Sequence, residues 1–121
     1  MPTTLQNELK KIPELEQSAL QLVNLAYSLF PNTSLKKKGR RWVFDPNFVT
    51  FQVQHARARN IAITLRGNPD EFPHHSAPKL KPDQAGYSIF RFSDPSQLSA
   101  ASDYIKRAAE LYKLGRNRKR L

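Results

Sequence analysis

Cysteine is absent from the 121-residue chain, and its absence excludes several classes of site. A disulfide scaffold, a cysteine-based zinc site, an iron–sulfur cluster and a cysteine nucleophile all require thiols. The chain also lacks the ~20-residue apolar run that a membrane span needs, so we expect no membrane partner. Charged side chains interrupt the first thirty residues, where a signal peptide would be apolar, and this favours a cytoplasmic location.

Acidic residues are scarce relative to basic ones, ten against twenty, and the formal net charge is +10. The excess lies in two segments. Residues 36–66 hold eight basic groups and one acidic group, and residues 106–121 hold seven and one. Such segregation indicates a basic face or arm that meets a polyanion.

Hydrophobic spacing predicts helices at both ends of the chain. Apolar residues recur three and four apart from Leu5 to Phe30, with Pro13 at the first turn of the second helical piece. The last helix follows Asp94 as N-cap, with Gln97 as its capping-box partner, and stops near Gly115.

Four segments rich in β-branched and aromatic residues predict strands, at residues 41–44, 48–54, 61–66 and 87–92. The expected fold is a single α+β domain over residues 1–114, in the order α-βββ-β-α. Its four-stranded antiparallel sheet would carry both terminal helices on one side. Residues 115–121 would form a basic, disordered tail.

The strongest functional signal is the run Lys36-Lys37-Lys38-Gly39-Arg40-Arg41-Trp42. Five cations in six positions repel one another, whereas a polyanion would be held by them with release of counterions. Trp42 beside them could stack on a base or sugar. The alternative interpretation is a solvated loop in which Trp42 anchors the first strand in the core.

Two further basic elements could contact phosphates. Arg57 and Arg59 lie at the expected tip of a hairpin, residues 55–60, where they could either contact phosphate and guanine or only discourage edge pairing. The tail could add non-specific affinity or serve solubility. The residues expected to contact nucleic acid are therefore Lys36, Lys37, Lys38, Arg40, Arg41, Arg57, Arg59, Arg116, Arg118, Lys119 and Arg120, with Trp42 as the stacking candidate.

Catalytic and metal-binding patterns are not evident in the sequence. His74 and His75 are adjacent in a proline-rich stretch, and neighbouring histidines do not readily point at one metal ion. The carboxylates and histidines show no nuclease-like, Ser/His/Asp or phosphate-loop spacing. We therefore expect no enzyme activity, no cofactor and no metal.

Residues 42–112 resemble a small bacterial α+β domain labelled "predicted transport protein", which occurs alone or appended to defence and restriction proteins. The matching segments are residues 47–51, 60–65 and 86–92 followed by the last helix. The outline is also similar to that of double-wing DNA-binding proteins. Either resemblance implies a bacterial accessory domain without known catalysis.

The sequence thus favours a small non-catalytic nucleic-acid-binding protein, with DNA preferred over RNA. One alternative is an interaction module of a defence or mobile-element system, whose basic face meets an acidic protein. A second is an unfamiliar enzyme that uses His74 and His75.

Overall fold

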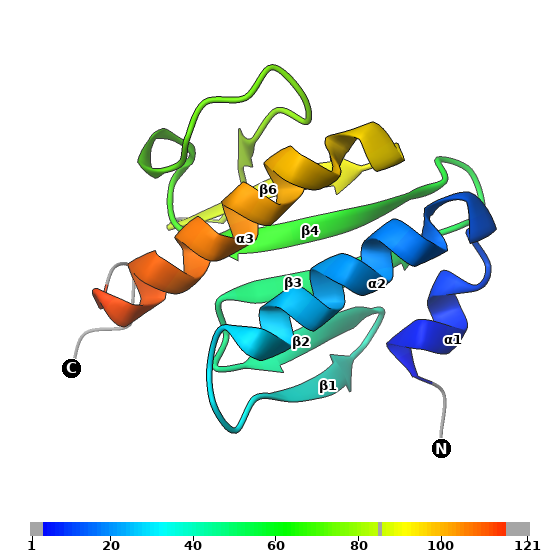
Figure 1. Ribbon diagram of the computed structural model, residues 1–121, viewed down its shortest axis with the longest axis horizontal. Helices are drawn as coiled ribbons and strands as arrows, with labels where there is room; N and C mark the ends of the chain where they lie inside the picture. The colour runs from blue at the N-terminus through cyan, green and yellow to red at the C-terminus, as the bar shows by residue number, and fades with distance from the viewer. Residues whose placement is uncertain (1–3, 85, 116–121) are drawn as a thin grey trace.

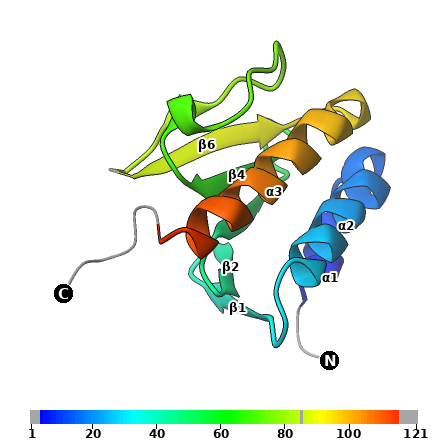
Figure 2. The same cartoon turned by 60° about the vertical axis from the view of Figure 1, so that its left-hand side comes forward.

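An antiparallel sheet of six strands carries the helices on one of its faces, as Figures 1 and 2 show. The computed structural model describes residues 4–84 and 86–115. Its helices are α1 (Leu5–Leu9), α2 (Pro13–Ser28) and α3 (Leu98–Lys113). Its strands are β1 (Ser34–Lys38), β2 (Arg41–Asp45), β3 (Val49–Gln54), β4 (Asn60–Arg66), β5 (Lys81–Pro82) and β6 (Tyr87–Phe92), in the spatial order β1-β2-β3-β4-β6-β5. The predicted α+β class is confirmed, but the predicted count of four strands is wrong.

The N-terminal helices form as the spacing predicts. Thr4 caps α1 by accepting a hydrogen bond from the Asn7 N–H at 3.1 Å. Pro13 occupies the first position of α2, where its missing N–H costs nothing. The buried side chains of α2 lie on one stripe and are Leu15, Ala19, Leu22, Val23 and Ala26.

The C-terminal helix begins with a short 3-10 turn, Pro95–Gln97, that leads into α3. Asp94 caps this turn by accepting from the Ser96 N–H at 2.8 Å. Hydrogen bonding to the side chain of Ser96, and then to its backbone N–H, lowers the pKa of Asp94. Gln97 reaches back to accept from the Ser93 N–H, so the expected reciprocal cap forms one residue earlier than predicted. None of the helices in the described part of the chain has the length and apolar character that crossing a membrane requires.

The lysine run lies in a strand that was not among the four predicted strands. β1 pairs with β2 from Ser34↔Asp45 to Lys38↔Arg41, and Gly39 and Arg40 form the turn between them. Gly39 has a φ of +62°, which a tight hairpin turn needs and which glycine adopts without strain. Lysines along the outer strand discourage pairing with another chain. The second strand that was not predicted is β5, a two-residue strand at the opposite edge of the sheet.

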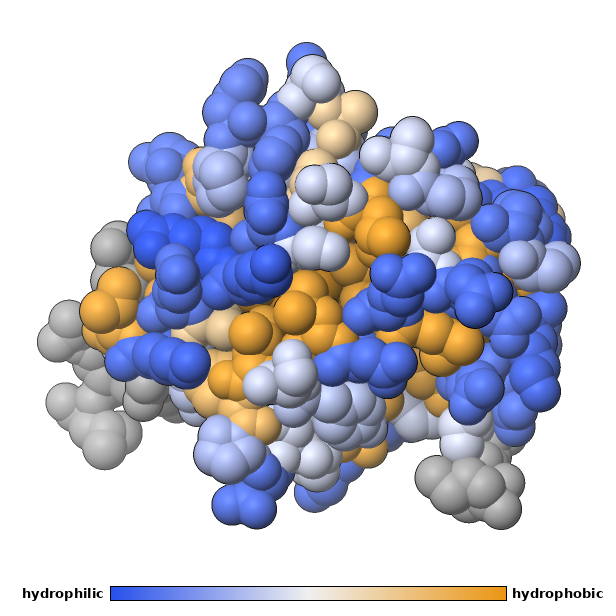
Figure 3. Space-filling model, viewed as in Figure 1, coloured by the Kyte–Doolittle hydropathy of each residue, from blue (hydrophilic) through white to orange (hydrophobic). Residues whose placement is uncertain are grey.

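Side-chain alternation gives the sheet a buried face and an open face. The helix-covered face holds the core, in which Phe44, Phe51, Ile63 and Phe92 are fully buried. On the helix side, Figure 3 shows apolar side chains in a band along α2 and α3, while the end near α1 is largely hydrophilic. The opposite face of the sheet carries none of the helices α1, α2 and α3 of the described residues (Figure 2).

We expect Phe51→Ala and Gln52→Ala to differ sharply in their effect on stability, because the two side chains lie on opposite faces of β3. Phe51 is fully buried, and its truncation should lower the free energy of unfolding by about 3–5 kcal/mol. Gln52 is on the open face, and its truncation should change stability by less than about 0.5 kcal/mol. Urea denaturation of both variants measures the difference, and equal losses would contradict the assignment of faces.

Candidate nucleic-acid interface

A hollow opens at one end of the sheet, where β3 extends beyond its pairing with β2. That pairing ends at Phe51, whereas β3 continues to Gln54 before the β3–β4 tip, residues 55–59. The β1–β2 turn, the β3–β4 tip and α1 all lie at this end (Figure 1). Between them is a hollow of about 550 Å³, which we call the basic hollow.

Cations from four separate segments line the basic hollow. Lys11 comes from the link between α1 and α2, Lys37 from β1, Arg40 from the β1–β2 turn and Arg57 from the β3–β4 tip. His55 lies in the same wall. The side chains of Lys11, Arg40 and Arg57 are exposed and have no ion-pair or hydrogen-bond partner among the described residues. Their charges are therefore available to an anion.

Among the described residues, Glu8 is the single carboxylate in the lining of the basic hollow. Its Oε2 lies 2.7 Å from Nζ of Lys37, whose ammonium group also lies 5.6 Å from the centre of the Trp42 ring. The Glu8 side chain is only 14% exposed, so it is held in place more firmly than the exposed cations opposite. An incoming phosphate would compete with Glu8 for Lys37.

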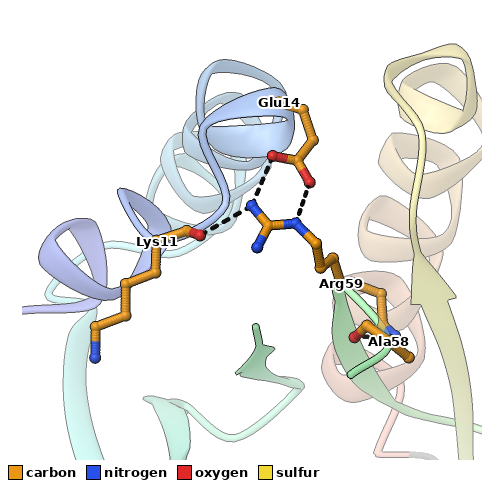
Figure 4. A network of polar contacts seen from close by, with 5 residues as sticks. Lys11, Glu14, Ala58 and Arg59 are labelled. Carbon is orange, nitrogen blue, oxygen red and sulfur yellow. Dashed lines mark hydrogen bonds and ion pairs between the residues drawn. The ribbon is translucent and has the colours of Figure 1, made fainter. Parts of the chain in front are cut away.

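Arg59 has a different role from Arg57, because it ties the β3–β4 tip to the start of α2. Figure 4 shows its guanidinium facing the Glu14 carboxylate, with Nε 2.7 Å from Oε2 and Nη2 2.9 Å from Oε1. Nη2 also donates to the Lys11 carbonyl oxygen at 3.1 Å. The hydrogen bonds from Arg59 lower the pKa of Glu14 to about 2. The Lys11 side chain extends away from this ion pair (Figure 4).

The structure divides the predicted contact residues between two regions. Lys37, Arg40 and Arg57 meet at the basic hollow. Lys36, Lys38 and Arg41 are exposed on the open face, because they alternate with Lys37 and Trp42 along the β1–β2 hairpin. The tail residues Arg116, Arg118, Lys119 and Arg120 lie outside the described residues.

Trp42 is a core residue and does not form a stacking platform. It is 7% exposed and belongs to the same cluster of buried side chains as Phe44 and Phe51. Lys37 lies over its ring. Of the two interpretations of Trp42, the structure supports the core anchor, because a ring that is so little exposed offers no face on which a base could stack.

Comparison with protein-family models, curated proteins and solved structures finds no match. The resemblances drawn from the sequence therefore stay predictions. Two lining residues, Lys11 and His55, were not expected at the site. Lys11 belongs to residues 1–35, which hold two basic and three acidic groups, and tertiary packing brings it to the hollow. No local sequence pattern marks either residue.

His74 and His75 lie far from the basic hollow in sequence, in the loop that follows the Pro69–Glu71 turn. Nε2 of His75 is 3.2 Å from Oδ2 of Asp103, and its ring packs edge-on against Tyr104. Within the described residues, no three His, Asp or Glu side chains are grouped closely enough to hold a metal ion.

The Arg59–Glu14 pair predicts a specific loss of stability in acid. The pKa of Glu14 is about 2 in the folded protein against 4.5 for the free side chain. The pair therefore stabilises the fold fully above about pH 4.5, and this contribution is lost as the pH falls toward 2. Urea midpoints of the wild type and Glu14→Gln should differ at pH 7 and converge near pH 2.

Arg59→Gln removes the same ion pair and should reproduce the pH profile of Glu14→Gln. A constant difference between wild type and Glu14→Gln from pH 7 to pH 2 would contradict the account.

Proposed function

We propose that this protein is a non-catalytic nucleic-acid-binding protein that contacts phosphates at the basic hollow. The observation that supports this most strongly is the convergence of Lys11, Lys37, Arg40 and Arg57 from four segments on one hollow. Like charges brought together by folding repel one another, so the arrangement is favourable chiefly when a polyanion neutralises them. Arg59 positions the tip and is not itself a contact in this proposal.

DNA is the preferred nucleic acid in this proposal because of the shape of the β3–β4 tip. A two-stranded ribbon fits the major groove of B-DNA, about 12 Å wide, whereas the major groove of A-form RNA is too narrow for side chains to read. Arg57 lies at the exposed tip of such a ribbon. The tail cations Arg116, Arg118, Lys119 and Arg120 would add affinity that does not depend on sequence.

The test measures the salt dependence of binding to a fluorescent mixed-sequence DNA duplex by anisotropy. Arg40→Gln/Arg57→Gln should weaken binding about tenfold or more in 50 mM salt and reduce the slope of log K against log salt by about 2, since each phosphate contact contributes ~0.9. The control is Lys79→Gln/Lys106→Gln, which removes two exposed charges outside the basic hollow. We expect the control to change affinity less than about twofold.

Three results would contradict the proposal. One is the absence of binding by the wild type in 50 mM salt. Another is an equal loss in both double variants, which would indicate a response to net charge alone. The third is binding to polyglutamate of matched charge that is as tight as binding to DNA, which would favour an acidic protein as the partner.

A further inference from the structure

The open face of the sheet has a row of side chains that crosses all six strands in register. Each neighbouring pair in this row is matched across the sheet, and side chains paired in this way share a face. The row consists of Lys36, Val43, Thr50, Thr64, Ile89 and Lys81. Its centre is therefore neutral and its two ends are lysines.

Cations are spaced across this face at distances set by the strands. Lys36 on β1 and Lys81 on β5 are five strand spacings apart, roughly 24 Å at ~4.8 Å per spacing. Arg41 on β2 and Arg91 on β6 are three spacings apart, roughly 14 Å. All four side chains are exposed. The face thus has positive charge toward both edges, a neutral central row, and one carboxylate, Asp83, beside the central threonines.

The basic hollow and the open face are connected around the end of β3. Gln52 lines the basic hollow and also a hollow of about 240 Å³ on the open face, which it shares with Arg41. Gln54 also lines the basic hollow, and its Oε1 accepts a hydrogen bond from Nη1 of Arg91 at 2.8 Å. The cations of the two regions are therefore linked by neutral amide side chains.

We propose that the open face is a second phosphate-contacting surface, continuous with the basic hollow, and that the nucleic acid it holds is a duplex. This inference rests on the proposed function. A duplex presents two phosphate backbones on either side of a groove about 12 Å wide, which matches cations toward both edges of a face whose central row is neutral. A single strand has one backbone and is commonly held by exposed aromatic rings.

The aromatic side chains of the described residues do not supply such rings on the open face. Tyr87 is the aromatic residue that β6 places there, and the Arg66 guanidinium lies 5.2 Å from the centre of its ring. The remaining aromatic residues of the sheet strands point into the core. Phosphate contact is thus the interaction that this face offers.

Asp83 provides a test in which the expected change in affinity is opposite, because it is an acidic residue at the same surface. It lines the open-face hollow of about 240 Å³ and a neighbouring hollow of about 230 Å³, in each case together with Arg41, Thr50 and Thr64. A phosphate backbone that crosses this face would be repelled by the Asp83 carboxylate. Removing that charge should therefore tighten the binding of a duplex.

The experiment compares a 16-base-pair DNA duplex, the same single strand and a duplex RNA by anisotropy in 50 mM salt. Arg41→Gln/Arg91→Gln should weaken duplex binding about tenfold and leave single-strand binding within about twofold. Asp83→Asn should tighten duplex binding by about two- to threefold without affecting the single strand. Arg40→Gln/Arg57→Gln, in the basic hollow, should weaken both.

Each outcome separates the two proposals. If the wild type binds none of the three nucleic acids, both proposals fail. Suppose that the basic-hollow variant weakens binding, but that Arg41→Gln/Arg91→Gln weakens duplex and single-strand binding equally or leaves both unchanged. The proposed function then stands, and the proposal of a duplex-binding surface on the open face is wrong. Thermal unfolding of each variant confirms its fold, and Lys36→Gln/Lys81→Gln repeats the test at the sheet edges. Stronger binding of duplex RNA than DNA would overturn the DNA preference alone.

Discussion

The pairing of Trp42 with Phe51 across β2 and β3 determines which face every neighbouring side chain takes. Both rings enter the core, and the alternation that follows sends Lys37 to the helix side and Lys36 and Lys38 to the open face. A shift of one residue in this register would reverse each of these assignments and bury lysines. The apolar core therefore decides where the charge of the molecule appears. One continuous basic run becomes two surfaces because it is a strand.

A second constraint is the contact between Arg59 and the start of α2. The guanidinium holds the Glu14 carboxylate and the Lys11 carbonyl, so it joins the β3–β4 tip to the link between α1 and α2. That contact lies beside the basic hollow and keeps Lys11 near Arg57. Arg57 and Arg59 at the same tip thus have different roles. Arg59 makes a structural contact, whereas Arg57 has no partner among the described residues and is available to an anion.

Periodicity in the sequence was sufficient to predict the long helices and four of the strands, because their apolar residues recur with a helix or strand period. β1 was missed because three of its five residues are lysines, which are uncommon in strands. It forms a strand by pairing with β2, and that pairing is not visible in its own residues. β5 was missed because two residues cannot show a period. For the candidate site, the clusters of basic residues were visible in the sequence. The sequence could not show that these cations divide between two faces, that Lys11 joins them, or that Arg59 makes a structural contact, because all three depend on tertiary packing.

The most direct test of this account is a ¹H–¹⁵N NMR titration of the protein with a short DNA duplex in low salt. The account predicts that shifts concentrate at the β1–β2 turn, the β3–β4 tip and the strand residues of the open face, including Arg41 and Arg91. The outward residues of α2 and α3 should stay unchanged, because those helices cover the opposite face (Figure 2). Shifts confined to α2 and α3, or none at saturating duplex, would contradict it.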